Sequence, residues 1–216
     1  MKLLVSGCQL GVSAFVGEMS SAVITLAYNF VILGIAGNIG VAAYGVVANI
    51  AIVTTAAFNG IAQGSQPLIS KCFGKGDREG CLQLKKMGYI TAFVLAGIMY
   101  CILFTFSKEF VAIFNSEGSE MMAVYADMGV KLYFTGIFFA GLNIVGSGVF
   151  SATQEAVKAA VVSVARGFVF ILGFVFLLSY LFEMTGVWLA YAAAEGATCV
   201  LMFVMLISDR SKMRNK

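Results

Sequence analysis

The sequence predicts an all-α integral membrane protein, and three observations lead to this fold class. Of its 216 residues, 60% are hydrophobic and only 12% are charged. The mean hydropathy is +0.93, which is far above that of ordinary soluble domains. The apolar residues also gather in six stretches, each at least as long as the ~20 residues that a bilayer-crossing helix requires. We therefore expect six transmembrane helices.

The six predicted spans follow one another with short connections. They cover about residues 9–35, 41–70, 87–106, 128–150, 159–182 and 185–207. An uncharged turn at 36–40 joins the first two spans, and a loop rich in Gly and Lys follows the second. The connection between the third and fourth spans is longer and mildly acidic. Together these elements predict a single six-helix membrane domain over residues 1–216.

The distribution of Lys and Arg predicts how the chain is oriented in the membrane. If the N-terminus is cytoplasmic, twelve of the 14 basic residues fall on the cytoplasmic side, and only Lys108 and Lys131 fall on the other side. Basic residues favour the cytoplasmic side of a membrane protein. We therefore expect a multi-pass chain with both termini in the cytoplasm.

The composition argues against several classes of function. No histidine is present, which excludes His-based zinc sites and Ser-His or Cys-His catalytic pairs. The five cysteines are scattered and odd in number, so neither a disulfide framework nor a metal site is predicted. The basic residues lie in loops without interleaved aromatic residues, which argues against a nucleic-acid partner. We expect no enzymatic activity and no cofactor, and the lipid bilayer is the first predicted partner.

A polar stripe runs along the second predicted span. Thr55, Asn59, Gln63 and Gln66 recur at helical spacing on one face of an otherwise apolar segment. Polar side chains in a membrane helix face a neighbouring helix or an aqueous cavity rather than lipid. The stripe therefore predicts a wet cavity, with hydrogen bonding between helices as the alternative. Pro67 follows the stripe and predicts a kink.

Two carboxylates lie inside predicted spans, where an ionisable group is costly and points to a functional site by default. Glu18 lies in the first span, and Asn29 is nearly on the same helix face about three turns later. Glu195 lies in the middle of the sixth span, within YAAAEGAT. Each is a candidate for taking up and releasing a proton, or for holding a cation. The alternative is a carboxylate locked to other groups for structural reasons.

Two further sets of charged residues are predicted to have structural roles. Asp127 and Lys131 have i,i+4 spacing at the outer end of the fourth span, which predicts a solvated ion pair. Glu155 and Arg166 flank the connection between the fourth and fifth spans. We expect this second set to orient a cytoplasmic loop and a helix end, because nothing in the surrounding sequence indicates a pocket.

Several runs of residues resemble one transporter family. The seventh and eighth helices of bacterial multidrug and toxic compound extrusion (MATE) transporters resemble the run YNFVILGIAGNIGVAAYGVVANIAIVTTAAFNGIAQGSQPLISKCFGKGD. The tenth to eleventh helices look like GLNIVGSGVFSATQEAVKAAVVSVARG, and the twelfth helix looks like TGVWLAYAAAEG. The most specific match is GIAQGSQPLIS with the basic loop that follows it. The resemblance extends over about residues 13–207, which is nearly the whole chain.

The resemblance implies half of a twelve-helix transporter of the MOP superfamily. MATE proteins have two six-helix lobes and exchange H⁺ or Na⁺ for drugs and organic cations by alternating access, and this chain resembles the C-terminal lobe. The resemblance implies an ion-coupling role for Glu18, and Glu195 is our second candidate. It also implies the bacterial inner membrane as location, and an N-terminal lobe or a second copy as partner. The expected substrate cavity comprises Asn29, Thr55, Asn59, Gln63, Gln66 and Asn143.

Two alternatives stay open at this point. A lipid-linked oligosaccharide flippase of the same superfamily would share the architecture, but we would expect more Arg and Lys in its cavity to bind phosphate. A non-transporting or truncated membrane subunit would give Glu18 no coupling role. Because Met1 begins almost directly at a span that resembles the seventh helix, the sequence favours an incomplete transporter.

Overall fold

The computed structural model describes the backbone of residues 2–115 and 118–214, and side chains at residue 19 and over 22–115 and 118–206. All regular elements in these ranges are helical, as the sequence predicts, and no strand occurs among the described residues. The α-helices are α1 (Lys2–Gly74), α2 (Arg78–Thr105), α3 (Ser107–Phe114), α4 (Glu120–Tyr133), α5 (Ile137–Ala152), α6 (Ala156–Val164) and α7 (Ile171–Arg214). A 3-10 turn, η1 (Phe134–Gly136), joins α4 to α5, and a π-helical turn, η2 (Ala165–Phe170), joins α6 to α7.

Four helical segments of the described chain are long and apolar enough to cross a membrane. They are Ala22–Gly74, Arg78–Thr105, Glu120–Ala152 and Ala156–Leu206. The first and last have 53 and 51 residues. A straight helix of that length would extend over about 75 Å, more than twice the ~30 Å thickness of a hydrocarbon core. The direction of the chain within these two segments therefore decides how they fit a bilayer.

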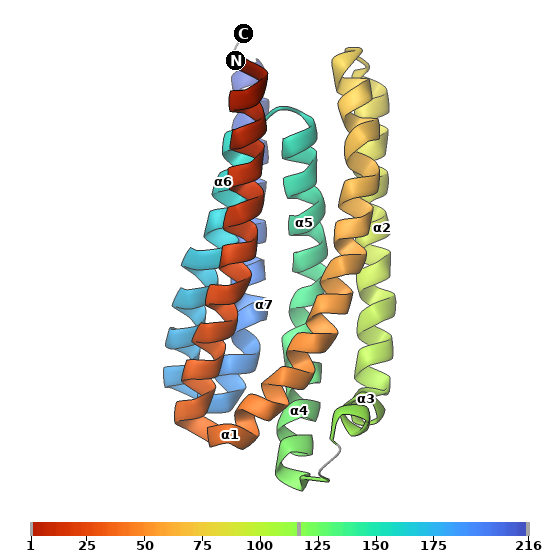
Figure 1. Ribbon diagram of the computed structural model, residues 1–216. Helices are drawn as coiled ribbons and strands as arrows, with labels where there is room; N and C mark the ends of the chain where they lie inside the picture. Colours follow the sequence, from red (N-terminus) through yellow and green to blue (C-terminus); the bar gives the residue numbers. More distant parts are fainter. Residues whose placement is uncertain (1, 116–117, 215–216) are drawn as a thin grey trace.

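Each of the two longest segments reverses direction at a residue with non-helical backbone angles. In α1 this residue is Gly37 (φ 64°, ψ −157°), inside the predicted turn at 36–40. In α7 it is Glu183 (φ 49°, ψ −131°), between the predicted fifth and sixth spans. Figure 1 shows α1, in red and orange, running away from the N-terminus and returning, and α6 with α7, in cyan and blue, doing the same. The helices consequently lie side by side in one bundle.

Pro67 lies inside α1, and the helix continues beyond it to Gly74. Within the described part of α1, the backbone leaves helical angles at Gly37 and not at Pro67. A membrane helix tolerates proline because neighbouring groups and small local adjustments satisfy the freed carbonyl. The main change of direction in α1 therefore depends on the glycine rather than on the proline.

The ion pair predicted at the start of the fourth span is confirmed. Lys131 Nζ donates to Asp127 Oδ2 at 2.8 Å, and both side chains are partly exposed. Ser107 Oγ, at the first position of α3, donates to Asp127 Oδ1 at 2.5 Å. The carboxylate thus ties α3 to α4 as well as accepting from its own helix, which holds the short helix α3 across the end of the bundle (Figure 1).

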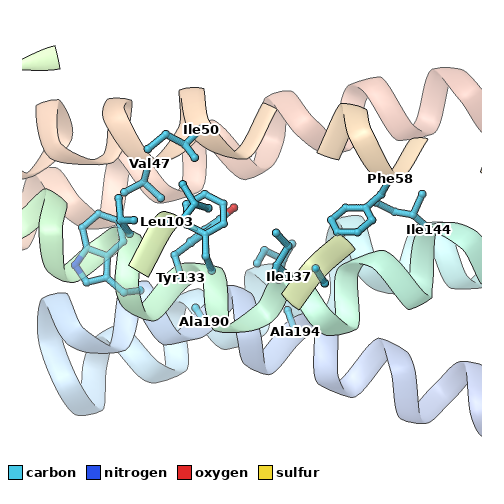
Figure 2. Close-up of a cluster of buried hydrophobic side chains, with 14 of the residues drawn as sticks. Val47, Ile50, Phe58, Leu103, Tyr133, Ile137, Ile144, Ala190 and Ala194 are labelled. Atoms are coloured by element: carbon cyan, nitrogen blue, oxygen red, sulfur yellow. The ribbon is translucent and has the colours of Figure 1, made fainter. Parts of the chain in front are cut away.

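The bundle packs around buried apolar side chains contributed by α1, α2, α4, α5 and α7. Figure 2 shows part of this core, including Val47 and Phe58 of α1, Leu103 of α2 and Ile137 of α5. Because lipid is as apolar as these side chains, close packing rather than exclusion of water holds membrane helices together. Of the four long segments, Glu120–Ala152 is the most deeply buried, and most residues of its second helix, α5, are buried. The packing of α5 against its neighbours therefore decides how the helices fit together.

A run of contacting aromatic rings crosses the core. Tyr28 and Tyr44 of α1 stack with their centroids 4.8 Å apart, and the Tyr44 ring lies 6.4 Å from that of Trp188 in α7. Tyr133 of α4 meets Tyr28 edge-on at 6.3 Å and stacks on Tyr191 of α7 at 4.1 Å. Such pairs contribute about 0.5–1.5 kcal/mol each beyond the burial of their area. The run connects α1 through α4 to the middle of α7.

Glycines allow the central helix to approach its neighbours closely. A Cβ atom at Gly136 would lie 2.8 Å from Cα of Ala192, and one at Gly141 would lie 2.7 Å from the ring of Phe58. Real Cβ atoms do not come so close to other heavy atoms, so these positions accept only glycine without movement of the neighbour. The contact at Gly136 is with backbone, which fixes the distance between the start of α5 and the middle of α7.

Exchanging residue types at the two reversals should change stability in opposite directions. The angles of Gly37 are essentially open only to glycine, so Gly37→Ala should lower the free energy of unfolding by about 1–3 kcal/mol. Glu183→Gly should raise it, because a non-glycine residue is strained at positive φ. Thermal unfolding in detergent measures both. Gly34→Ala is the control, since an added Cβ has no neighbour within 4 Å at either Gly34 or Gly37. Equal effects at these two glycines would contradict this explanation.

Adding a methyl group at Gly136 should loosen the contact between α5 and α7. Because the nearest atom is backbone, the helices must separate, and Gly136→Ala should destabilise the protein by roughly 1–3 kcal/mol. Gly173→Ala on α7 is the matched control, because no atom lies within 4 Å of its added Cβ. Both are measured as shifts of the thermal unfolding midpoint. A Gly136→Ala protein as stable as the control would show that stability does not depend on the close approach of the two helices at Gly136.

Candidate functional site

A buried carboxylate lies at the junction of three helical elements. Glu195 of α7 is only 2% exposed, although it lies in a segment apolar enough to cross a membrane. Its neighbours along the helix are small, with Ala192, Ala193, Ala194, Gly196 and Ala197 surrounding it in the sequence. Small residues let neighbouring helices come close. The local sequence therefore brings donors from other helices within reach of this carboxylate.

Donors from two other elements meet the Glu195 side chain. Asn143 Nδ2 of α5 donates to Glu195 Oε2 at 2.8 Å and to the backbone oxygen of Glu195 at 2.9 Å. Arg166 Nε of η2 donates to Glu195 Oε1 at 2.6 Å. Tyr191, one helical turn earlier on α7, lies close enough to Arg166 and Glu195 to interact with both electrostatically. Hydrogen bonds of this charge-assisted kind are the strongest in proteins.

Features of the local backbone place these groups. The approach of Gly136 to Ala192 brings α5 against α7, and Asn143 follows Gly136 by about two helical turns on the same side of α5. Arg166 belongs to the π-helical turn η2. A π-helical turn inserts extra chain into an α-helix, redirects the side chains that follow, and often occurs at functional sites. The wide turn therefore directs the guanidinium toward α7.

The aromatic run of the core ends at this cluster. Tyr133 stacks on Tyr191 with an angle of 6° between the ring planes. Tyr28 and Tyr133 lie close enough to Glu195 to interact with it electrostatically, as does Cys199 one turn further along α7. Tyr28 and Tyr133 thus approach the carboxylate from α1 and α4, and Tyr191 approaches it from α7. They provide polar groups in an environment that is otherwise apolar.

Not every polar atom near the cluster has a partner. Among the described residues, the buried side-chain atoms without a hydrogen-bond partner are Asn143 Oδ1, Tyr28 Oη and Trp188 Nε1. Buried polar atoms are nearly always satisfied, and leaving one unpaired costs about 1–3 kcal/mol. Asn143 Oδ1 is an acceptor in the residue whose amide nitrogen already holds Glu195. The cluster therefore contains one buried acceptor atom, Asn143 Oδ1, that receives no hydrogen bond.

The charges of the cluster cancel within it. Glu195 is buried and Arg166 is paired to it, so the carboxylate has a compensating cation in the protein itself. Removing one partner of such a pair is strongly destabilising, because the other charge is left uncompensated. Within the described residues, no group of three or more His, Cys, Asp and Glu side chains could hold a metal ion. Glu195 and its neutral neighbours are chemically suited to hold one positive charge, which Arg166 supplies in this structure.

The residues predicted to form a substrate cavity lie in different environments. On the returning half of α1, Asn59 and Gln63 are exposed, while Thr55 and Gln66 are partly buried. Gln66 is near α5, because a Cβ at Gly148 would lie 3.0 Å from Gln66 Nε2. Thus the stripe presents its two middle amides on the surface of the bundle.

No hydrogen bond among the described residues joins the remaining predicted site residues to this stripe. Asn29 is partly buried on the first half of α1. Asn143 is 1% exposed and is held by Glu195 in the interior. Glu18 lies within α1, but its side chain is outside the described residues.

The role predicted for Arg166 is wrong. The sequence places it at a cytoplasmic helix end, whereas its guanidinium reaches Glu195, 29 residues away, in the interior of the bundle. Glu155 does remain in the loop after α5, where it pairs with Lys158 and accepts from Thr153. The position of Arg166 inside an apolar span was a signal of a functional partner. The partner itself depends on the π-helical turn, which the sequence does not reveal.

Two surface hollows lie apart from this cluster. One of about 520 Å³ is lined by apolar side chains of α1 and α7, among them Phe30, Ile35 and Phe176. The other, of about 270 Å³, lies between α3 and α4 and includes Lys108, Asn115 and Asp127. Neither is lined by Glu195 or its donors, so the interior cluster is the candidate site.

The chain resembles bacterial multidrug transporters in sequence. It is 25% identical over 212 residues to the multidrug export protein MepA of Staphylococcus saprophyticus, covering 97% of this chain and 46% of that protein. It is 25% identical over 206 residues to MepA of Staphylococcus aureus, covering 94% of this chain and 44% of that protein. The chain thus spans about half the length of the curated relatives it matches.

Solved structures share the fold of the bundle. An inward-facing multidrug resistance MATE family transporter of the MOP superfamily superposes with a TM-score of 0.89 and 15% identity, covering 100% of this chain and 50% of that one. An outward-facing transporter of the same description superposes with a TM-score of 0.88, covering 96% and 47%. The MatE family model matches residues 13–178, which is more than half of the chain. This chain therefore belongs to the MatE family of multidrug and toxic compound extrusion transporters.

Proposed function

We propose that the chain is the C-terminal lobe of a transporter that exports small organic cations or drugs in exchange for H⁺ or Na⁺ by alternating access. The observation that carries this proposal is the buried Glu195 cluster, which joins α5, η2 and α7 inside an apolar bundle. Intramembrane ionisable groups of this kind typically belong to ion or proton pathways. The names of the relatives, multidrug export proteins, support the same activity. The proposed protein is a transporter rather than an enzyme.

We propose that the 216 residues form one membrane domain with six crossings. The segments Ala22–Gly74 and Ala156–Leu206 are each too long for one crossing and reverse at Gly37 and Glu183. Each would supply two crossings. The segments Arg78–Thr105 and Glu120–Ala152 would supply one each. Six crossings place both ends of the chain on the same side, and the excess of Lys and Arg in that side's segments favours the cytoplasm.

We propose the bacterial inner membrane as the location and a second lobe as the partner. The relatives are bacterial proteins about twice as long as the stretch that this chain matches. A substrate path in transporters with internal repeats lies between the repeats. The partner lobe is therefore an N-terminal half or a second copy of this chain, and the exposed amides of Asn59 and Gln63 would face it. Asn29, Thr55, Gln66 and Asn143 complete the proposed cavity residues.

We propose Glu18 and Glu195 as the ion-coupling residues. Both are acids in segments that we place in the membrane. Glu195 already has a cation in contact, the guanidinium of Arg166, so a coupling ion must compete with it. We propose Glu18, whose coupling role the family resemblance implies, as the primary coupling acid.

A lipid-linked oligosaccharide flippase is a less favoured alternative. Such a protein needs cationic side chains available to phosphate. The one arginine that we place inside the bundle of described residues, Arg166, is occupied by Glu195. The exposed polar groups of the stripe are amides, which suit an organic cation better than a phosphate.

Transport by the chain in liposomes tests the proposed function. If two copies of the chain supply both lobes, we expect uptake of the fluorescent cation ethidium driven by an H⁺ or Na⁺ gradient, and we expect Glu18→Gln to reduce uptake to the level of protein-free liposomes. If an N-terminal half is required, we expect the chain alone to bind ethidium without transporting it. Glu109→Gln is the matched control, because Glu109 is an exposed acid on the short helix α3. Folded protein that neither transports nor binds ethidium would contradict the proposal and favour a non-transporting subunit.

A further inference from the structure

The Glu195 cluster is built from the atoms that bind small hard cations. The carboxylate oxygens of Glu195, the amide oxygen of Asn143 and the hydroxyl of Tyr191 are all oxygen ligands, the kind that alkali metal ions and protons prefer. Asn143 Oδ1 is buried and unpartnered, so one of these oxygens has nothing to accept. An unsatisfied acceptor beside a buried carboxylate indicates a position for a positively charged group.

Arg166 supplies the positive charge in the conformation described here. Its Nε–H group donates to Glu195 Oε1, and Tyr191 contacts both residues. The two members of the pair differ in their access to the surroundings, since the Arg166 side chain is 28% exposed and the Glu195 side chain is 3% exposed. Arg166 can therefore leave the site without opening the bundle, whereas Glu195 cannot.

The π-helical turn gives Arg166 room to move. In η2 the backbone hydrogen bonds follow the wider π pattern, and such turns are rare and commonly occur at functional sites. Conversion of η2 to a regular α-helix would shift the register of the helix and rotate Arg166 away from α7. Asn143 and Tyr191 belong to regular helices and would keep their places.

Among the described residues, the groups that face Glu195 include one cation, the guanidinium of Arg166. They are Tyr28 of α1, Tyr133 of α4, Asn143 of α5, Arg166 of η2, and Tyr191 and Cys199 of α7. The tyrosines, the cysteine and the asparagine are neutral near pH 7. When the guanidinium leaves, the buried carboxylate must either take up a proton or bind another cation, because an unpaired charge is too costly in this environment.

We infer that Glu195, Asn143 and Tyr191 form a binding site for a monovalent cation, H⁺ or Na⁺, and that Arg166 occupies this site until the cation replaces it. One positive charge leaves as another arrives, so the charge of the cluster is constant. The inference depends on the proposed antiport in one respect, which is that the bound cation is taken to be the coupling ion. The site itself is tested without transport.

The experiment is thermal unfolding of the purified full chain in detergent, followed by the fluorescence of Trp188. This is the only tryptophan of the sequence, and it is fully buried. Four proteins are compared: wild type, Arg166→Lys, Arg166→Gln, and Arg166→Gln combined with Glu195→Gln. Each is measured with Na⁺ replacing K⁺ at constant ionic strength, and between pH 8 and pH 6. The response of Glu18 is present in all four and cancels in the comparison.

We expect Arg166→Gln to raise its unfolding midpoint by about 5 °C or more on addition of cation at 100-fold above its dissociation constant. A response to Na⁺ at fixed pH identifies sodium, and a response to pH alone identifies the proton. The double variant should lack the part of this response that exceeds wild type, because it has no carboxylate at position 195. Arg166→Lys keeps the resident charge and should respond as weakly as wild type.

An Arg166→Gln protein that responds no more than the double variant would overturn the inference. If Arg166→Gln is not folded in K⁺ at pH 8, purification in Na⁺ or at pH 6 should recover it, since the cation replaces the missing guanidinium. Failure to recover it under both conditions, with the double variant folded, would equally overturn the inference. A failure of ethidium transport would not alter either result.

Discussion

One carboxylate in an apolar bundle governs how the helices of this chain are assembled. Glu195 cannot be left uncompensated in the interior, so donors must converge on it from other parts of the chain. Asn143 comes from α5 and Arg166 from η2. The close approach at Gly136, the π-helical form of η2 and the small residues around Glu195 are the conditions that allow this convergence. A single charge thus ties together the last half of the chain.

The aromatic run extends the same cluster to the first half of the chain. Tyr191 contacts the ion pair, Tyr133 stacks on Tyr191, and Tyr28 of α1 meets Tyr133. The bundle therefore has a continuous set of contacts from α1 to α7. Superposition with TM-scores of 0.89 and 0.88 on two solved transporters shows the fold that these contacts hold together.

The sequence predicts the elements of this structure better than the contacts between them. Hydropathy locates the helical segments, and the uncharged glycine-containing turn locates the reversal at Gly37. The i,i+4 spacing of Asp127 and Lys131 predicts their ion pair because helix geometry alone brings them together. The partners of Glu195 lie 52 and 29 residues away and depend on helix packing and on a π-helical turn. The sequence therefore misplaces Arg166, and it predicts Glu195 and Asn143 as separate candidates rather than as partners.

The central claim is that Glu195 and Arg166 stabilise the bundle only as a pair, and a double-mutant cycle tests it most directly. The free energy of unfolding is measured for wild type, Arg166→Met, Glu195→Leu and the double variant. Each single change should cost about 3–5 kcal/mol, because it leaves one buried charge alone, and the double variant should be more stable than either. If the costs of the two single changes simply add in the double variant, the pair is not the constraint on which the bundle depends.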